Sequence, residues 1–263
     1  MAEKTKLIDV SKCTGCRGCQ LACKQWNGLP AGQTFAAGTY QNPPDLQPNT
    51  WTLIRFQEVA AKEGVKWLFR KDGCMHCTDA ACVKVCPSGA LYHSDLGTVG
   101  IINERCIGCK ECVAACPFEI PRYDRVTDRV YKCDLCLSRI RADLPPACVK
   151  ACPTGALTFG DKEEMLKLAY KRAKELGGDA SVYGDKFVDG THVLYVLQEK
   201  KQVYDILPAH PRVPLSVMAW KDLLKPLSLV AAGGVLAASF LHYIIHGPKT
   251  PDDDDNHKTE GGA

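Results

Sequence analysis

Four groups of four cysteines constrain this 263-residue chain more than any other feature of its sequence. The first group, within residues 13–23, and the third, within residues 106–116, share the spacing C-x2-C-x2-C-x3-C. The second, within residues 74–86, is spaced C-x2-C-x4-C-x3-C, and the fourth, within residues 133–152, is spaced C-x2-C-x11-C-x3-C. All sixteen cysteines belong to these groups, and a proline directly follows each of the last three. Such repetition indicates a metal-binding framework that recurs along the chain.

The spacing of the cysteines distinguishes iron–sulfur clusters from zinc sites and from disulfides. The third group, followed by Pro117, has the spacing by which bacterial ferredoxins hold a [4Fe–4S] cluster. Three closely spaced thiolates on one loop reach three corners of a cubane, and the fourth cysteine ligates the other cluster of a pair. Structural zinc usually takes two separated C-x2-C pairs, and disulfides need an oxidising compartment and give no reason for repeated quartets. The sequence therefore predicts four [4Fe–4S] clusters, with zinc and disulfides as the alternatives.

The order of the groups predicts how they pair. The second and third groups are close enough along the chain to form one compact two-cluster unit. The first and fourth groups flank this unit and are left to pair with each other. Near copies at residues 87–91 (PSGAL) and 153–157 (PTGAL) each predict a turn that leads into a short strand. We therefore predict an α+β fold with a duplicated two-cluster bacterial-ferredoxin-like domain, one ferredoxin unit nested inside another.

Because the last cysteine of each group crosses to the partner cluster, four ligand sets follow. The first outer set is Cys13, Cys16, Cys19 and Cys152, and the second outer set is Cys23, Cys133, Cys136 and Cys148. The first inner set is Cys74, Cys77, Cys82 and Cys116, and the second inner set is Cys86, Cys106, Cys109 and Cys112.

Other patterns divide the rest of the chain. We expect a β-hairpin from residues 51–57 and 65–70, and a helix that starts after Asp161, with Glu164 in a capping box, and stops at Gly177. Residues 191–197 are typical of a buried strand. The predicted divisions are residues 1–73 (first group, loop and hairpin), 74–125 (inner ferredoxin unit), 126–160 (fourth group), 161–219 (helix and strand), 220–248 (membrane helix) and 249–263 (acidic tail).

The predicted membrane helix rests on a long apolar segment. Residues 226–248 contain no Asp, Glu, Lys or Arg, and about twenty residues at about 1.5 Å each match a hydrocarbon core of about 30 Å. A buried core helix is the alternative. Trp220 and Tyr243 are expected at the two membrane interfaces. His242 and His246, four residues apart, could contact a haem or quinone of a partner, or could be interfacial polar residues. Residues 1–12 contain no apolar signal-peptide segment.

Charge and motif content exclude several functions. The formal net charge of +3, without a Lys/Arg-rich tract, gives no reason to expect nucleic-acid binding. Neither a dinucleotide-binding nor a Walker A motif occurs, and no catalytic constellation is recognisable. We expect His76, between two cysteines, to form local hydrogen bonds rather than ligate metal. The basic residues within or beside the cysteine motifs could offset cluster charge, or be ordinary solvated side chains: Lys12, Arg17, Lys24, Lys84, Lys110, Lys132 and Lys150.

The chain resembles the β subunit of membrane-bound respiratory formate dehydrogenases over residues 7–248. The resemblance is carried by the segments LIDVS (7–11), RKDGCMHC (70–77), CPF (116–118), IPR (120–122), RVYKC (129–133), PACVK (146–150), GTHV (190–193), KPL (225–227) and HYI (242–244). The cysteine framework is shared by many redox complexes, whereas the terminal span and the region around 191–197 are more specific. His246 departs from the family pattern.

This resemblance implies a non-catalytic electron-transfer subunit with four clusters. A catalytic α subunit with a molybdenum or tungsten pterin would oxidise formate, and a cytochrome b γ subunit in the inner membrane would receive the electrons and reduce quinone. It also implies a single-pass protein with a periplasmic body, exported with the α subunit on that partner's twin-arginine signal. No small-molecule substrate is expected on this chain.

Three other interpretations remain at this point. The same relay could serve a hydrogenase or a polysulfide- or DMSO-type reductase. The chain could instead be an enzyme with its own substrate site, although the sequence offers no residues for one. It could also be a zinc-stabilised membrane scaffold, which would be colourless and free of sulfide.

Overall fold

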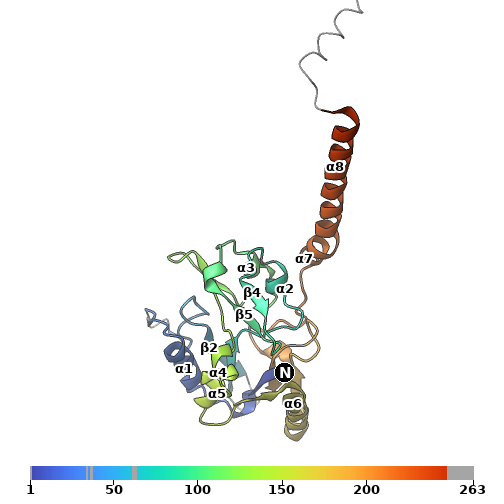
Figure 1. The fold of residues 1–263 in the computed structure, drawn as a ribbon. Coiled ribbons are helices and arrows are strands. Elements are labelled where there is room, and N and C mark those ends of the chain that lie inside the picture. The colour runs from blue at the N-terminus through green and yellow to red at the C-terminus, as the bar shows by residue number, and fades with distance from the viewer. Residues whose placement is uncertain (1, 34, 36–37, 61–63, 248–263) are drawn as a thin grey trace, which may run out of the picture. The chain divides into compact units, whose positions relative to one another are not determined.

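The computed structural model describes residues 2–33, 35, 38–60 and 64–247 (Figure 1). The chain divides into two compact units, Met1–Val217 and Met218–Ala263. All sixteen cysteines lie in the first unit, together with a four-stranded sheet and three two-stranded hairpins in the described residues. Pro248 and the predicted acidic tail at 249–263 lie outside the described residues.

The sheet combines strands from both ends of the first unit. Its strand order is β8 (Leu157–Asp161), β1 (Lys4–Asp9), β10 (Val193–Leu197) and β9 (Ser181–Tyr183). β1 runs parallel to β10 and antiparallel to β8, and β9 runs antiparallel to β10. All five residues of β10 are buried, as the apolar run at 191–197 predicts. The sheet thus joins the start of the chain to the strand that follows the fourth cysteine group.

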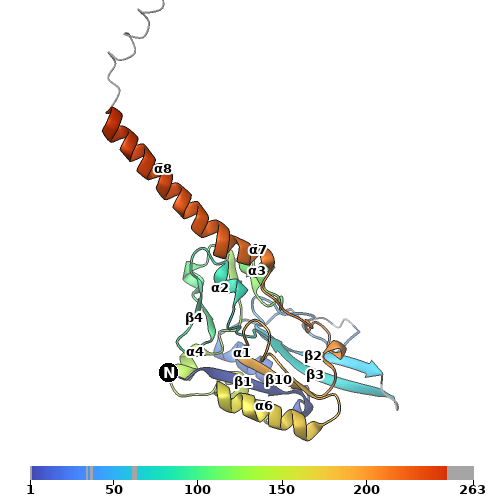
Figure 2. The same ribbon diagram turned by 90° about the vertical axis from the view of Figure 1, so that its right-hand side faces the viewer.

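Helix α6 (Lys162–Leu176) lies across one face of this sheet (Figure 2). Its inward residues Ala169 and Ala173 pack with Leu7 of β1 and with the β10 side chains of Leu194 and Val196. Small alanines at this contact let the helix backbone approach the sheet closely. The packing closes one side of the core.

The ends of α6 are where the sequence places them, but the predicted capping box is wrong. Asp161 is the N-cap residue and Gly177, with φ +66°, is the C-cap residue. Among the described residues the Asp161 side chain makes no cap hydrogen bond, because its carboxylate accepts one from Lys4 Nζ at 2.5 Å. This pair joins β8 to β1 at the sheet edge.

Three hairpins surround the sheet. Strand β2 (Thr52–Ala60) pairs with β3 (Val65–Gly73), which confirms the predicted hairpin; each strand ends three residues later than predicted, and β2 also starts one residue later. The shorter hairpins each lie next to a cysteine group: β4 (Leu91–His93) with β5 (Val99–Ile101), and β6 (Arg122–Asp124) with β7 (Arg129–Tyr131). The turns at Gly89 and Gly155 lead into β4 and β8 as the near-copy segments predict.

Short helices follow the cysteine loops and pair in a nested order. Helix α1 (Gly18–Trp26) of the first group packs against α5 (Ala147–Lys150) of the fourth, whereas α2 (Ala81–Lys84) packs against α3 (Glu111–Ala115) of the two inner groups. Helix α4 (Leu137–Arg141) follows the fourth group's first cysteine pair, and single 3-10 turns occur at Val10–Lys12, Asn103–Arg105 and Lys201–Val203. This is the predicted arrangement of one ferredoxin-like pair enclosed by another.

The second unit contains a long apolar helix. Helix α7 (Leu215–Met218) ends where this unit begins and leads into a π-helical turn (Ala219–Leu224), which the sequence does not predict. Helix α8 (Lys225–His246) has 22 residues and a mean hydropathy of 1.8, and none of that span is buried. At about 1.5 Å per residue it is about 33 Å long, enough to cross a hydrocarbon core. The buried-core alternative does not fit a helix that is exposed throughout.

Candidate iron–sulfur sites

The cysteine loops owe their shape to left-handed backbone positions that repeat between copies. In the first group Gly15 and Arg17 have φ +70° and +60°, and in the third group Gly108 and Lys110 have φ +67° and +64°. Glycine adopts such angles without steric cost, which explains its place between the first two cysteines. The resulting tight loop turns three thiols toward one space.

Three cavities in the first unit are lined by four cysteines each. The thiols come from one loop, with a single cysteine contributed by a different group. The lining cysteines are Cys13, Cys16, Cys19 and Cys152; Cys74, Cys77, Cys82 and Cys116; and Cys86, Cys106, Cys109 and Cys112. These are the cysteines of the first outer set and both inner sets.

The remaining four cysteines are also neighbours. Burial raises the pKa of Cys23, and the thiols of Cys133, Cys148 and Cys136 raise it further because like charges close together repel. The structure thus brings the members of the second outer set together, with Cys23 from α1 and the others from the fourth group.

Burial sets the electrostatics of these thiols. Desolvation raises the pKa of Cys19 to about 11 and that of Cys112 to about 12. It also raises the pKa of Cys136 to about 12, with Cys133 adding to the effect. Such thiols ionise only when a metal replaces the proton, so loading these sites releases protons. Buried, clustered thiols around a small space fit iron–sulfur clusters.

Hydrogen bonds to sulfur come from the neighbouring backbone. The N–H of Val130 in β7 donates to Cys106 Sγ at 3.4 Å, and the N–H of Leu135 donates to Cys133 Sγ at 3.4 Å. Hydrogen bonds to ligand sulfurs stabilise the reduced, more negative state of a cluster. The fold thus places backbone N–H donors against two of the cysteine sulfurs.

The two residues just before β10 anchor the second cysteine group. Cys77 pairs with Thr191 in an isolated β-bridge, and the N–H of His192 donates to the carbonyl oxygen of His76 at 2.9 Å. His76 is fully buried, and its Nδ1 accepts a hydrogen bond from the Val99 N–H at 3.1 Å. Burial holds the pKa of His76 well below its usual value, so it is neutral. This confirms the prediction of a local hydrogen-bonding role.

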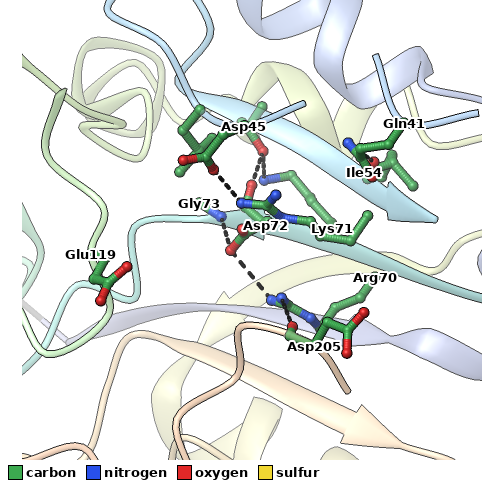
Figure 3. Close-up of polar contacts among 12 residues, drawn as sticks. Gln41, Asp45, Ile54, Arg70, Lys71, Asp72, Gly73, Glu119 and Asp205 are labelled. Atoms are coloured by element: carbon green, nitrogen blue, oxygen red, sulfur yellow. Dashed lines mark hydrogen bonds and ion pairs between the residues drawn. The ribbon is translucent and has the colours of Figure 1, made fainter. Parts of the chain in front are cut away.

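A buried ionic network fixes the β2–β3 hairpin beside the first outer set (Figure 3). Asp72 accepts hydrogen bonds from Arg55 Nε at 2.8 Å and from the Gly73 N–H at 3.0 Å, and its other contact is Arg70 at 3.3 Å. All three ionic side chains are less than 10% exposed. Arg70 also reaches the carbonyl oxygen of Asp205, which ties the hairpin to the segment after β10.

Two buried lysines near the cysteine sulfurs were not predicted from the sequence. Lys6 in β1 and Lys71 in β3 are each 2% exposed, and neither lies in a cysteine motif. Lys132, one of the predicted basic residues, is equally buried, and its Nζ donates to the carbonyl oxygens of Val99 and Cys133. The available signal was a run of three charged residues, Arg70-Lys71-Asp72, inside a strand that ends one residue before a cysteine group.

The histidines of α8 contact each other. Their rings stack with centroids 4.3 Å apart, and His246 Nδ1 lies 3.2 Å from the carbonyl oxygen of His242.

The fold and sites define a class: a ferredoxin-type electron-transfer protein whose sixteen cysteines fit four [4Fe–4S] clusters. Two family models described as 4Fe-4S dicluster domains match residues 65–162 and 12–90, and one described as formate dehydrogenase N, transmembrane, matches residues 213–256.

Similar proteins show to which family within this class the chain belongs. The chain is 46% identical to a formate dehydrogenase iron-sulfur subunit of Haemophilus influenzae, over 98% of this chain and 85% of the relative. It is also 46% identical to the nitrate-inducible formate dehydrogenase iron-sulfur subunit of Escherichia coli, over 97% and 89%. A thiosulfate reductase electron transfer subunit of Salmonella typhi is 37% identical over 69% and 92%. The chain belongs to the family of formate dehydrogenase iron–sulfur subunits, non-catalytic partners with a membrane-anchoring segment.

Proposed function

We propose that this chain carries electrons from a formate-oxidising subunit with a molybdenum or tungsten pterin to a cytochrome b subunit, which reduces quinone. The observation that carries the proposal is the lining of three cavities by cysteines from two different groups each. A single-cluster or zinc framework gives no reason for this exchange, whereas paired ferredoxin clusters require it.

In this proposal the four predicted sets are the ligands. Three thiols from a loop and one from the paired group hold each cluster, so each pair of cysteine groups is locked together by two clusters. When bound, a [4Fe–4S] cluster accepts and donates single electrons. The chain's own residues hold it rigidly, donate hydrogen bonds to the ligand sulfurs and keep water away.

The exposure of individual thiols supports particular points at which electrons enter and leave the chain. Cys16 of the first outer set and Cys109 of the second inner set are exposed, whereas Cys19 and Cys112 of the same sets are buried. Ile107, beside Cys109, is 61% exposed. We infer that these two sets approach the partner subunits, because electron transfer between proteins needs a short path through a thin protein shell.

Membrane placement belongs to the same proposal. Helix α8 crosses the inner membrane once, with the cluster-binding unit on the periplasmic side. Protease added to spheroplasts with an intact inner membrane should then degrade the cluster-binding unit, whereas cytoplasmic marker proteins stay intact. Protection of the unit until the membrane is lysed would place it in the cytoplasm.

The test of function uses the native complex. We would purify it anaerobically through a tag on this chain and follow the broad iron–sulfur absorbance near 400 nm. Rapid bleaching by formate, to the extent reached with dithionite, is expected. Bleaching by dithionite alone would assign the relay to another oxidoreductase, for which the thiosulfate reductase relative offers a precedent. A colourless protein that contains zinc would refute the iron–sulfur function itself.

A further inference from the structure

Lys71 is a buried cation that lines a cluster site. It lies on β3, three residues before Cys74, and its side chain lines the same cavity as Cys13, Cys16 and Cys19. The residue is 2% exposed. Its Nζ donates a hydrogen bond to the Thr52 hydroxyl on the paired strand β2. The hairpin therefore holds an ammonium group at the wall of the first outer set.

The ammonium has no carboxylate partner in the part of the chain that the structure describes. The nearest candidate in sequence, Asp72, points to the guanidinium groups of Arg55 and Arg70 instead (Figure 3). Adjacent residues of a strand face opposite sides, which separates Lys71 from that network. A buried ammonium with only a hydroxyl for a partner is costly unless an anion lies nearby.

The anions that face Lys71 are cysteine sulfurs of both outer sets. After the opposing effect of burial, the pKa of Lys71 is raised by the thiolates of Cys148, Cys19 and Cys133, in that order. Cys19 belongs to the first outer set, and the other two belong to the second. The Lys71 ammonium is thus close enough to sulfurs of both outer sets to interact with them.

The other buried lysines are placed differently. The Lys132 ammonium is satisfied by two carbonyl oxygens, at 2.6 Å and 3.0 Å. Lys71 lowers the pKa of Cys19 more than Lys6 does, and Lys6 lowers the pKa of Cys133 more than Lys71 does. Lys71 also lines the cavity of the first outer set, whereas Lys6 lines none of the three cysteine-lined cavities.

We propose that Lys71 is the internal counter-charge of the outer cluster pair and holds the reduction potential of the cluster in the first outer set at a raised value. The inference rests on the proposed ligand sets. Adding one electron to that site adds one negative charge, and a fixed positive charge in a dry interior stabilises the more negative state. Lys71 is a positioning residue for charge and touches no substrate.

The test is a redox titration of the purified complex, followed by electron paramagnetic resonance. In K71M, which keeps an unbranched side chain that is one atom shorter and removes its charge, we expect the reduction equilibrium of one cluster to shift at least tenfold toward the oxidised form. For a one-electron couple that is a potential lowered by about 59 mV. The other clusters should shift less, and K71R should restore most of the loss.

A matched control lies on the same strand. Lys66 of β3 is 42% exposed and pairs with Glu199, so K66M removes the same charge from a solvated position. We expect K66M to leave all four potentials unchanged. An equal shift in K66M and K71M would assign the effect to net charge and overturn the proposal.

A second variant covers the case in which K71M does not assemble. T52V removes the hydroxyl that Lys71 Nζ contacts and leaves the ammonium with the sulfurs alone, so the same potential should rise. Unchanged potentials in either variant would refute the role of Lys71. Iron content separates this from failure of the proposed function: a wild-type complex with zinc or little iron would refute the ligand sets themselves.

Discussion

Gly108 lies between Cys106 and Cys109 in the loop of the third cysteine group, and G108A should remove one cluster. Its φ is +67°, and a Cβ there would lie 2.6 Å from the carbonyl oxygen of Asp128. Real Cβ atoms are essentially never that close to another heavy atom, and a backbone oxygen cannot rotate away. The loop or the turn before β7 would have to move.

Two costs combine at this position. A left-handed angle costs a non-glycine residue about 1–2 kcal/mol. Overpacking adds about 1–3 kcal/mol, so the total is about 2–5 kcal/mol. Gly89 provides the matched control because its φ is +64° with nothing within 4 Å of the added Cβ. G89A should therefore carry only the first cost.

Guanidinium-induced loss of absorbance near 400 nm in the anaerobic complex measures the difference. G108A should bleach at lower denaturant than G89A and, as isolated, should contain about four fewer iron atoms per chain, those of the second inner set. Gly15 occupies the equivalent position in the first group, where the added Cβ meets ring atoms of Phe69 and Phe56 at 3.1–3.2 Å. Rings can shift, so G15A should fall between the other two. Equal behaviour of G108A and G89A would refute the steric argument.

Three further predictions follow from other parts of the structure. D72A leaves the buried guanidinium of Arg70 without its carboxylate, while Arg55 keeps its ion pair with Asp45, and should destabilise the first unit by about 3–5 kcal/mol in the same denaturant assay, whereas an effect below about 1 kcal/mol would mean that the network is solvated. C116S should remove the paramagnetic signal that C77S removes and keep the one that C109S removes; the reverse result would refute crossed ligation. V235R places a charge at the centre of α8, at a cost of about 2.5–3.5 kcal/mol, and should reduce the fraction retained in carbonate-washed membranes, whereas S228K near the helix end should be retained. Full retention of V235R would contradict a membrane span.

The cysteine spacing predicted the nested fold because the clusters themselves dictate it. Once three thiols must face one cubane and a fourth must reach its neighbour, the loops and the pairing of groups follow. The ends of α6, at Asp161 and Gly177, were also readable, since they depend on local backbone preferences. The failure of the capping box could not be predicted, because Lys4 of another strand donates a hydrogen bond to the Asp161 carboxylate.

Long-range placement explains what the sequence could not reveal. Strand β1 has the sequence KTKLID, and all of its residues but the first are buried. Its two lysines make such a buried strand hard to recognise from the sequence. From the sequence alone, Lys6 and Lys71 would be expected at the surface, but the fold buries both of them. Their burial follows from strand pairings, those of β1 with strands distant in sequence, which no local pattern of charged residues expresses. The buried lysines thus had to be found in the structure.

The most direct test of the central claim is to count iron and acid-labile sulfide in the anaerobically purified complex, after subtracting what the partner subunits contribute. Four clusters in this chain predict about 16 iron atoms and about 16 sulfides per chain, with no stoichiometric zinc. Stoichiometric zinc without sulfide, or iron for only two clusters, would contradict the nested four-cluster arrangement.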